Sequence, residues 1–91
     1  MAERIRASHI LVKDQSLATD LLKKAQGGAK FADLARAHST CPSKRQGGDL
    51  GFFGRGQMVR EFEETAFALQ PGQMGGPVKT EFGYHIILRT E

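Results

Sequence analysis

The spacing of the hydrophobic residues changes within the first thirty positions, and this change constrains the fold more than any other feature of the sequence. Residues 4–12, RIRASHILV, alternate at first and then become apolar, which is typical of a strand covered on both faces. Residues 14–28 switch to a helical period, with apolar side chains at i, i+1, i+4, i+5 and i+8 from Leu17. A second short helix is expected over residues 30–39, before Pro42 discourages its continuation. The chain therefore begins as one strand followed by two helices.

The second half of the chain returns to strands around one further helix. A glycine-rich segment, residues 46–58, holds a short strand at about 50–53, and residues 58–69 again have a helical pattern. Two strands then surround the triplet at 81–83, which predicts a hairpin near the C-terminus. This order of strand, helices, strand, helix and hairpin predicts an α+β sheet with helices packed on it. Because no internal repeat or linker is present, we expect residues 1–91 to form a single domain.

Composition argues against several classes of protein. Hydrophobic residues make up 40% of the chain and charged residues 25%, as in an ordinary globular domain. No apolar run approaches the roughly 18 residues that span a bilayer, and the N-terminal MAERIRASHI lacks the apolar core of a signal peptide. A single cysteine cannot form an internal disulfide, which fits a reducing compartment. We therefore expect a soluble, cytoplasmic protein that does not bind a membrane.

The net charge of +3 is only mildly basic. Basic residues are scattered along the chain, with small pairs at Lys23-Lys24 and Lys44-Arg45 and no long run. Only the charge would support an assignment as a DNA-associated protein, so we do not expect a nucleic-acid partner.

Two histidines lie inside apolar strand sequences, His9 in SHILV and His85 in YHIIL. Burial disfavours the charged imidazolium, so each is expected to be neutral, with one donor and one acceptor nitrogen that need partners. Two histidines on adjacent strands can satisfy each other with the help of a hydroxyl group. Candidate hydroxyls are those of Ser8, Ser39, Thr40 and Thr80. One such histidine would be an ordinary core residue, whereas two in matching contexts favour a functional pair.

Cys41 follows the second predicted helix and precedes Pro42, and its context leaves three interpretations open. It can be a small buried apolar residue. It can be a nucleophile with His9 or His85 as its base, although no hydrolase motif surrounds it. It can also join these histidines and His38 in a zinc site, but only His38 and Cys41 are close in sequence, unlike the paired ligands of structural zinc sites. The sequence disfavours the nucleophile and the zinc ligand.

The glycine-rich segment is not a phosphate-binding loop. It lacks the G-x-x-x-x-G-K-[ST] pattern, and GFFGRG would direct aromatic side chains toward the place of a phosphate. Glycine lets the backbone turn sharply and pack closely. The apolar side chains between the glycines can then point together into one pocket, shared with Met58 and Phe62. A shallow pocket of this kind suits a small apolar group such as a proline ring.

The segments SHILVK, GGDLGFFGRGQM, FEETAFAL and FGYHIILRTE together resemble the parvulin family of peptidyl-prolyl cis/trans isomerases. The resemblance extends over nearly all 91 residues, with the blocks in the family's order and spacing. It implies the parvulin (FKBP-like) fold, a four-stranded, mostly antiparallel sheet surrounded by four helices in the order βαααβαββ. It also implies isomerisation of X–Pro bonds in peptides and folding proteins, with no cofactor and no metal.

The same resemblance implies a role for eight residues of this sequence. The catalytic group would be His9, Cys41, Thr80 and His85, and the proline pocket would be Leu50, Met58, Phe62 and Phe82. Lys13 is followed directly by Asp14 and the first helix, so the basic loop of phosphate-directed parvulins is missing, and no WW module precedes residue 1. We therefore expect a small stand-alone parvulin without phosphoserine selectivity. It would act as a monomer on proline-containing peptides or unfolded segments.

Two questions stay open at this point. Cys41 can attack the substrate carbonyl or act through its local polarity, and we favour the second because an apolar surrounding disfavours the thiolate. The same fold can also serve as a non-catalytic, peptide-binding chaperone module. The presence of both Cys41 and the histidine pair favours the enzyme.

Overall fold

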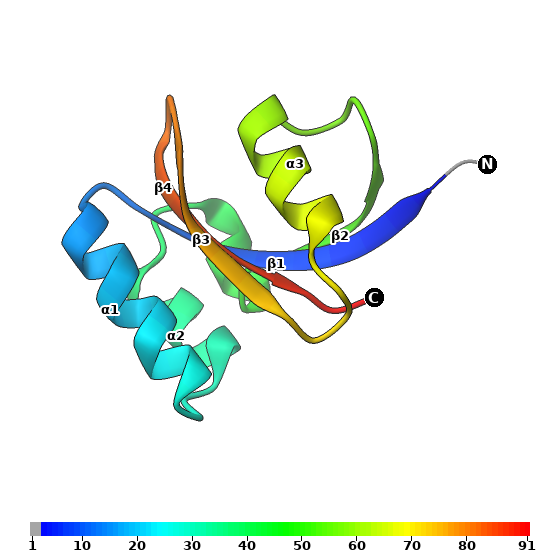
Figure 1. The fold of residues 1–91 in the computed structure, drawn as a ribbon. Coiled ribbons are helices and arrows are strands. Elements are labelled where there is room, and N and C mark those ends of the chain that lie inside the picture. The colour runs from blue at the N-terminus through cyan, green and yellow to red at the C-terminus, as the bar shows by residue number, and fades with distance from the viewer. Residues whose placement is uncertain (1–2) are drawn as a thin grey trace.

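The computed structural model describes residues 3–91, which form a four-stranded antiparallel sheet with helices on both faces (Figure 1). The strand order across the sheet is β2-β1-β4-β3. The elements in chain order are β1 (Arg4–Val12), α1 (Gln15–Gln26), α2 (Phe31–His38), the 3-10 helix η1 (Pro42–Gln46), β2 (Asp49–Gly54), α3 (Arg60–Ala68), β3 (Met74–Thr80) and β4 (Gly83–Arg89). The predicted α+β class and the C-terminal hairpin are confirmed.

One element differs from the expected order. We expected four helices, whereas residues 3–91 contain three α-helices, because the third helical segment is the 3-10 helix η1. Pro42 begins η1 with a favourable fixed φ, and Gly47 ends it in the left-handed conformation with a φ of 69°. The five residues of η1 leave little room for the i→i−4 bonds of an α-helix, so the tighter 3-10 turn forms.

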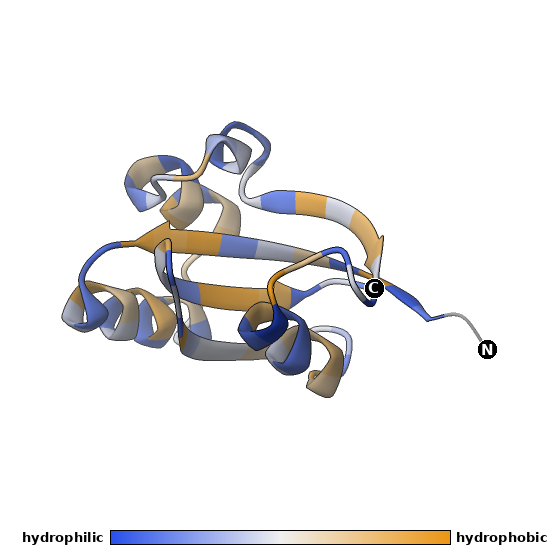
Figure 2. Cartoon of the chain, turned by 90° about the horizontal axis from the view of Figure 1, so that it is seen from above, coloured by the Kyte–Doolittle hydropathy of each residue, from blue (hydrophilic) through white to orange (hydrophobic). Residues whose placement is uncertain are grey.

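The two central strands, β1 and β4, send side chains alternately to the two faces of the sheet. On one face Ile10 and Ile86 pack against α1 and α2, and on the other Ala7 and Ile87 pack with α3. Figure 1 shows α3 above the sheet and α1 and α2 below it. Along β1 the residues change from hydrophilic near the N-terminus to hydrophobic at the far end (Figure 2). The sheet is therefore buried on both sides where α1, α2 and α3 cover it.

The first helix, α1, matches its predicted pattern except at one edge. The Asp14 carboxylate accepts a hydrogen bond from the Ser16 amide at 3.0 Å and so caps the helix. Leu21 and Ala25 are buried as expected, whereas Leu17 stays 36% exposed at the margin of the stripe. Among the helices of residues 3–91, none has both the length and the apolar character needed to cross a bilayer.

The glycine-rich segment lies directly against β1. The His9 amide donates to the carbonyl of Gly48 at 2.9 Å, and a Cβ at Gly48 would lie 2.4 Å from the His9 carbonyl oxygen. Only glycine fits this approach, and its φ of 88° also favours glycine. Further along β1, the Leu11 amide donates to Ser39 Oγ at 3.0 Å, and the Thr40 amide donates to the Leu11 carbonyl at 2.8 Å. The segment between α2 and β2 is therefore fixed along one edge of β1.

The last residues of the chain pair with the first strand at Arg6. The Arg6 amide donates to the Glu91 carbonyl at 3.0 Å, and the Thr90 amide donates to the Arg6 carbonyl at 2.8 Å. The Arg6 guanidinium also contacts both carboxylate oxygens of Asp49, at 3.2 and 2.5 Å. These contacts hold the pKa of the Asp49 carboxyl below its usual range. The start of β1, the start of β2 and the C-terminus are thereby joined.

Candidate active site

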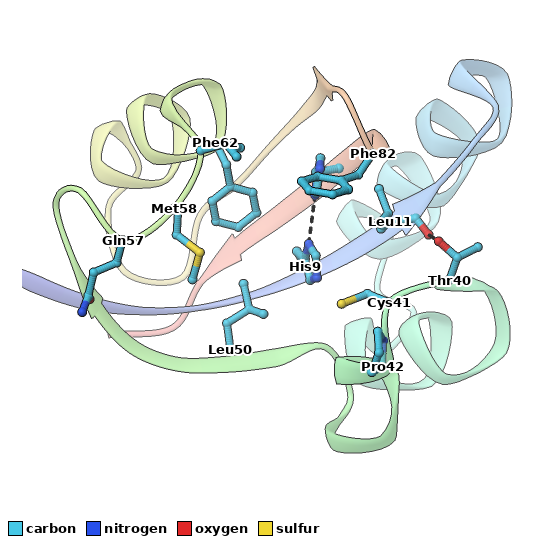
Figure 3. Close-up of a pocket in the computed structure, with 12 residues that line it drawn as sticks. His9, Leu11, Thr40, Cys41, Pro42, Leu50, Gln57, Met58, Phe62 and Phe82 are labelled. Carbon is cyan, nitrogen blue, oxygen red and sulfur yellow. Dashed lines mark hydrogen bonds between the residues drawn. The ribbon is translucent and has the colours of Figure 1, made fainter.

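A cavity of about 430 Å³ opens on the α3 side of the sheet. This volume lies within the range of about 300–1,000 Å³ that is usual for sites of small ligands. In Figure 3, Phe62, Met58 and Leu50 surround one part of the cavity, Cys41 and Pro42 lie on the other side, and His9 lies between them. The residues that line it are His9, Leu11, Thr40, Cys41, Pro42, Leu50, Gln57, Met58, Val59, Phe62, Phe82 and His85.

All four residues expected to hold a proline ring line this cavity. They are Leu50, Met58, Phe62 and Phe82. Leu50 comes from β2, Met58 from the β2–α3 turn and Phe62 from α3, so their common opening depends on the packing of three separate segments. Phe62 is 3% exposed, whereas Phe82 is 55% exposed at the tip of the β3–β4 hairpin. Their position is consistent with the expected pocket, and their role in binding proline stays a prediction.

The two histidines face each other across the central strands, as their sequence context predicts. His9 Nδ1 lies 3.0 Å from His85 Nδ1, and His85 Nε2 lies 2.7 Å from Thr80 Oγ1. The Phe82 amide also donates to Thr80 Oγ1 at 3.1 Å. Phe62 packs edge-on against both imidazoles, with ring centroids 5.6 and 5.4 Å apart. Thr80 does not line the cavity, but its hydroxyl contacts His85, which does.

Both imidazoles are buried and neutral. Burial lowers the pKa of His9 to about 4, with a smaller contribution from the neighbouring His85. Burial also lowers the pKa of His85. Neither side chain is therefore charged at neutral pH.

Each of these two histidine contacts uses one proton, so the chain of groups runs in one of two directions. If the Thr80 hydroxyl donates to His85 Nε2, His85 Nδ1 donates to His9 Nδ1 and His9 carries its proton on Nε2. If His85 Nε2 donates to Thr80, His9 Nδ1 donates to His85 Nδ1 and His9 Nε2 is unprotonated. Within the described chain this Nε2 is buried and has no partner. A second proton on His9 would add another donor to this apolar region.

Cys41 lies at the opposite side of the cavity from Met58 (Figure 3). It is a partly exposed free cysteine, and not the small buried apolar residue of the first interpretation. The Ser43 hydroxyl donates to Cys41 Sγ at 3.2 Å, and the Cys41 amide donates to Ser39 Oγ at 3.3 Å. The thiol is thereby held at the edge of the cavity, next to the start of η1.

Five lining residues were not predicted from the sequence to line a pocket, although Thr40 was considered as a hydroxyl partner of the histidines. They are Leu11, Thr40, Pro42, Gln57 and Val59. Each lies one or two positions from a predicted pocket or catalytic residue. Four of them are next to Cys41 or Met58 in the sequence, and Leu11 lies on the same face of the strand as His9. These positions were the signal that could have identified them.

No charged side chain contributes to the lining in residues 3–91, since the set contains no Lys, Arg, Asp or Glu. Over the same residues, no three His, Cys, Asp or Glu side chains are grouped closely enough to hold a metal ion. His38 is exposed and is not among the lining residues, so the set considered for zinc is not brought together.

Comparison with known proteins agrees with this geometry. Residues 9–91 match the family described as Rotamase, the PPIC-type PPIase domain. Foldase protein PrsA of Geobacillus sp. (strain WCH70) is 53% identical over 89 residues, which are 97% of this chain and 32% of that protein. The crystal structure of the peptidylprolyl isomerase PrsA from Bacillus anthracis has a TM-score of 0.94 at 48% identity, covering 96% of this chain and 41% of that one.

A second kind of relative matches this chain from end to end. The solution structure of NmPin, the parvuline of Nitrosopumilus maritimus, has a TM-score of 0.90 at 44% identity, covering 100% of this chain and 99% of that one. The chain thus spans about a third of the length of the foldases that it matches and nearly all of this parvulin. The chain therefore belongs to the PPIC-type, or parvulin, family of peptidyl-prolyl cis/trans isomerases.

Proposed function

We propose that this chain catalyses cis/trans rotation about X–Pro bonds by enclosing the proline ring in the cavity, without forming a covalent intermediate. The observation that carries this proposal is the common opening of Leu50, Met58 and Phe62 toward Cys41 and His9. Membership of the isomerase family supports the reaction, and the apolar lining supports the mechanism. Rotation about this one C–N bond needs neither a metal nor a cofactor.

The physical basis is the polarity of the amide. Rotation about the C–N bond costs about 18–20 kcal/mol because it breaks the resonance of the planar group. The planar form is more charge-separated than the twisted form, so an apolar site destabilises the planar form more than the twisted one. Each reduction of the barrier by about 1.4 kcal/mol speeds rotation tenfold. A dry cavity around the prolyl bond is therefore sufficient to give catalysis.

In this mechanism the histidine pair orients the site and transfers no proton. His9 and His85 are neutral near pH 7, because burial lowers the pKa of both. Their contact with Thr80 and with the Phe62 ring fixes the part of the cavity beneath the substrate. The rate of isomerisation should then show no step between about pH 6 and 8, where proton transfer by a histidine with an ordinary pKa would produce one.

Cys41 would act through its polarity as the carbonyl of the preceding residue rotates past it. The test is Cys41→Asp, measured by exchange NMR on a short Ala-Pro peptide. We expect the rate to fall by no more than about tenfold, since an aspartate keeps a polar group at the edge of the cavity. A folded Cys41→Asp protein with no activity would instead support attack by the thiol. The amide spectrum of the variant serves as the control for folding.

The lining also favours a class of substrate. No charged side chain lines the cavity within the described residues, so we propose that unmodified proline-containing peptides and unfolded protein segments bind in preference to phosphorylated ones. A panel of Xaa-Pro peptides with apolar, basic and phosphorylated Xaa tests this preference by the same exchange measurement. Faster isomerisation of the phosphorylated peptide than of its unmodified counterpart would overturn this choice.

The cytoplasmic location expected from the sequence stays a proposal. It rests on the single cysteine, which cannot form an internal disulfide. Fractionation of the native host, followed with an antibody against this chain, would test it. Recovery of the protein outside the cytoplasm would contradict it.

A further inference from the structure

We propose that Glu63 is a positioning residue, which sets the affinity for proline by holding the turn between β2 and α3 in place. This inference rests on the proposed function of the cavity. Glu63 is not among the residues that line the cavity, so it acts on the substrate only through the turn.

The turn matters because it supplies one continuous part of the cavity wall. Gln57, Met58 and Val59 all line the cavity, and they lie between the end of β2 and the start of α3. The backbone hydrogen bonds of β2 and α3 reach only as far as Gly54 on one side and, on the other, the Val59 carbonyl, which accepts from the Glu63 amide at 2.9 Å. The position of Met58 relative to Leu50 therefore depends on whatever side chains anchor the turn.

Glu63 supplies that anchor from the first turn of α3. Its Oε1 accepts a hydrogen bond from the Gly56 amide at 2.5 Å, and its Oε2 lies 3.7 Å from Arg55 Nη1. The Glu63 side chain is only 17% exposed, so these contacts are partly shielded from water. One carboxylate thus holds two consecutive residues, just ahead of Gln57 and Met58.

Two further contacts support this arrangement. The Arg55 guanidinium lies over the Phe67 ring, 4.4 Å from its centroid, which holds Arg55 against α3. The Gln57 side-chain oxygen accepts from the Gly54 amide at 2.6 Å. The turn is therefore held by side-chain acceptors, and Glu63 is the one that ties it to the helix carrying Phe62.

A matched control lies on the same helix. Glu64 is 62% exposed and pairs with Arg60 at 3.3 Å, one helical turn away. Glu64→Ala therefore removes a carboxylate and an ion pair from α3 without touching the turn. Glu63→Gln keeps the oxygen that accepts from Gly56 and removes only the charge opposite Arg55.

The experiment measures, for each variant, the dissociation constant of an Ala-Pro peptide by NMR titration and the isomerisation rate at saturation by exchange. For Glu63→Ala we expect the dissociation constant to rise about tenfold and the saturated rate to fall less than about threefold, because the loss lies in binding. Glu63→Gln should stay within about threefold of the parent, and Glu64→Ala within about twofold. The Gly56 amide resonance should shift in Glu63→Ala, and it should change little in the control.

The outcomes separate this proposal from the proposed function. A parent chain with no isomerase activity would defeat the function itself. An active parent with equal dissociation constants for Glu63→Ala and Glu64→Ala would overturn the positioning role alone. Should Glu63→Ala fail to fold, Glu63→Met takes its place, since it keeps the length of the stem and lacks the acceptor. Equal binding by Glu63→Met and Glu63→Gln would then count against the role.

Discussion

At the scale of single residues, the site depends on polar groups that are buried without charge. The sequence predicted that His9 and His85 are buried and paired, because each stands among residues that favour burial. The residue pattern left four hydroxyls open as their partner, the family resemblance pointed to Thr80, and in the structure it is Thr80 that contacts His85. The residue pattern alone could not make this choice, because it depends on the register of the hairpin that places Thr80 opposite Gly83, within reach of His85.

The free energy of unfolding should depend on pH through His9. Its pKa is about 4 in the folded protein and about 6.5 when unfolded, so the unfolded chain binds more protons between these values. Stability is therefore complete above pH 6.5 and decreases by about 3 kcal/mol as the pH falls to 4, with His85 acting in the same direction. Urea unfolding at several pH values would measure this, with the exposed His38→Ala as control. A flat profile over this range would contradict the neutral pair.

Removal of the Thr80 hydroxyl should destabilise the fold more than its size suggests. Thr80→Val keeps the volume but leaves His85 Nε2 and the Phe82 amide without their partner. We expect a loss of about 2 kcal/mol in the free energy of unfolding, since each unsatisfied buried group costs about 1–3 kcal/mol before relaxation. Urea denaturation checks this, and Thr90→Val, at an exposed hydroxyl, is the control. A loss as small as that of the control would mean that the hydroxyl is dispensable.

At the scale of elements, the hydrophobic period predicted the strands and the α-helices, whereas the conformation of the short segment between α2 and β2 was harder to predict. Its conformation is set by contacts with β1 at His9 and Leu11, which local sequence does not reveal. The same contacts explain the glycine-rich segment. Gly48 allows the close approach to β1, and Leu50, two positions later, is thereby placed on the cavity.

Two glycines of this run should respond differently to alanine. Both have positive φ, 88° at Gly48 and 72° at Gly51, but a Cβ at Gly51 meets nothing within 4 Å. Gly51→Ala should cost about 1–2 kcal/mol for backbone strain alone. Gly48→Ala should cost at least about 2 kcal/mol more, because the new Cβ would overlap the His9 carbonyl. Urea denaturation of the pair measures the difference, and equal costs would show that the approach to β1 is not tight.

At the scale of the whole molecule, the sequence identified the pocket residues but could not predict the cavity that they share. Its lining extends from His9 to His85 and comes from three strands, the segment between α2 and η1, η1 itself, a turn, a helix and the hairpin tip. Only the strand order β2-β1-β4-β3 brings these segments together, and strand order is a property of long-range pairing. The family resemblance supplied what period and spacing could not.

We expect the chain to be a monomer in solution. Its large exposed apolar side chains are Leu17, Phe52 and Phe82, which come from α1, β2 and the hairpin tip. Single exposed side chains of this kind do not make the continuous apolar surface of a stable dimer. Light scattering at micromolar concentration should give a mass close to 10.0 kDa. A mass near twice that value, constant on dilution, would contradict this prediction.

Arg6 makes backbone hydrogen bonds with Thr90 and Glu91, so the first strand and the last residues of the domain lie next to each other. A domain whose two ends lie close together can be inserted into a loop of a larger protein without distorting either one. The geometry of this domain is therefore suited to a place inside a longer chain as well as to an isolated domain.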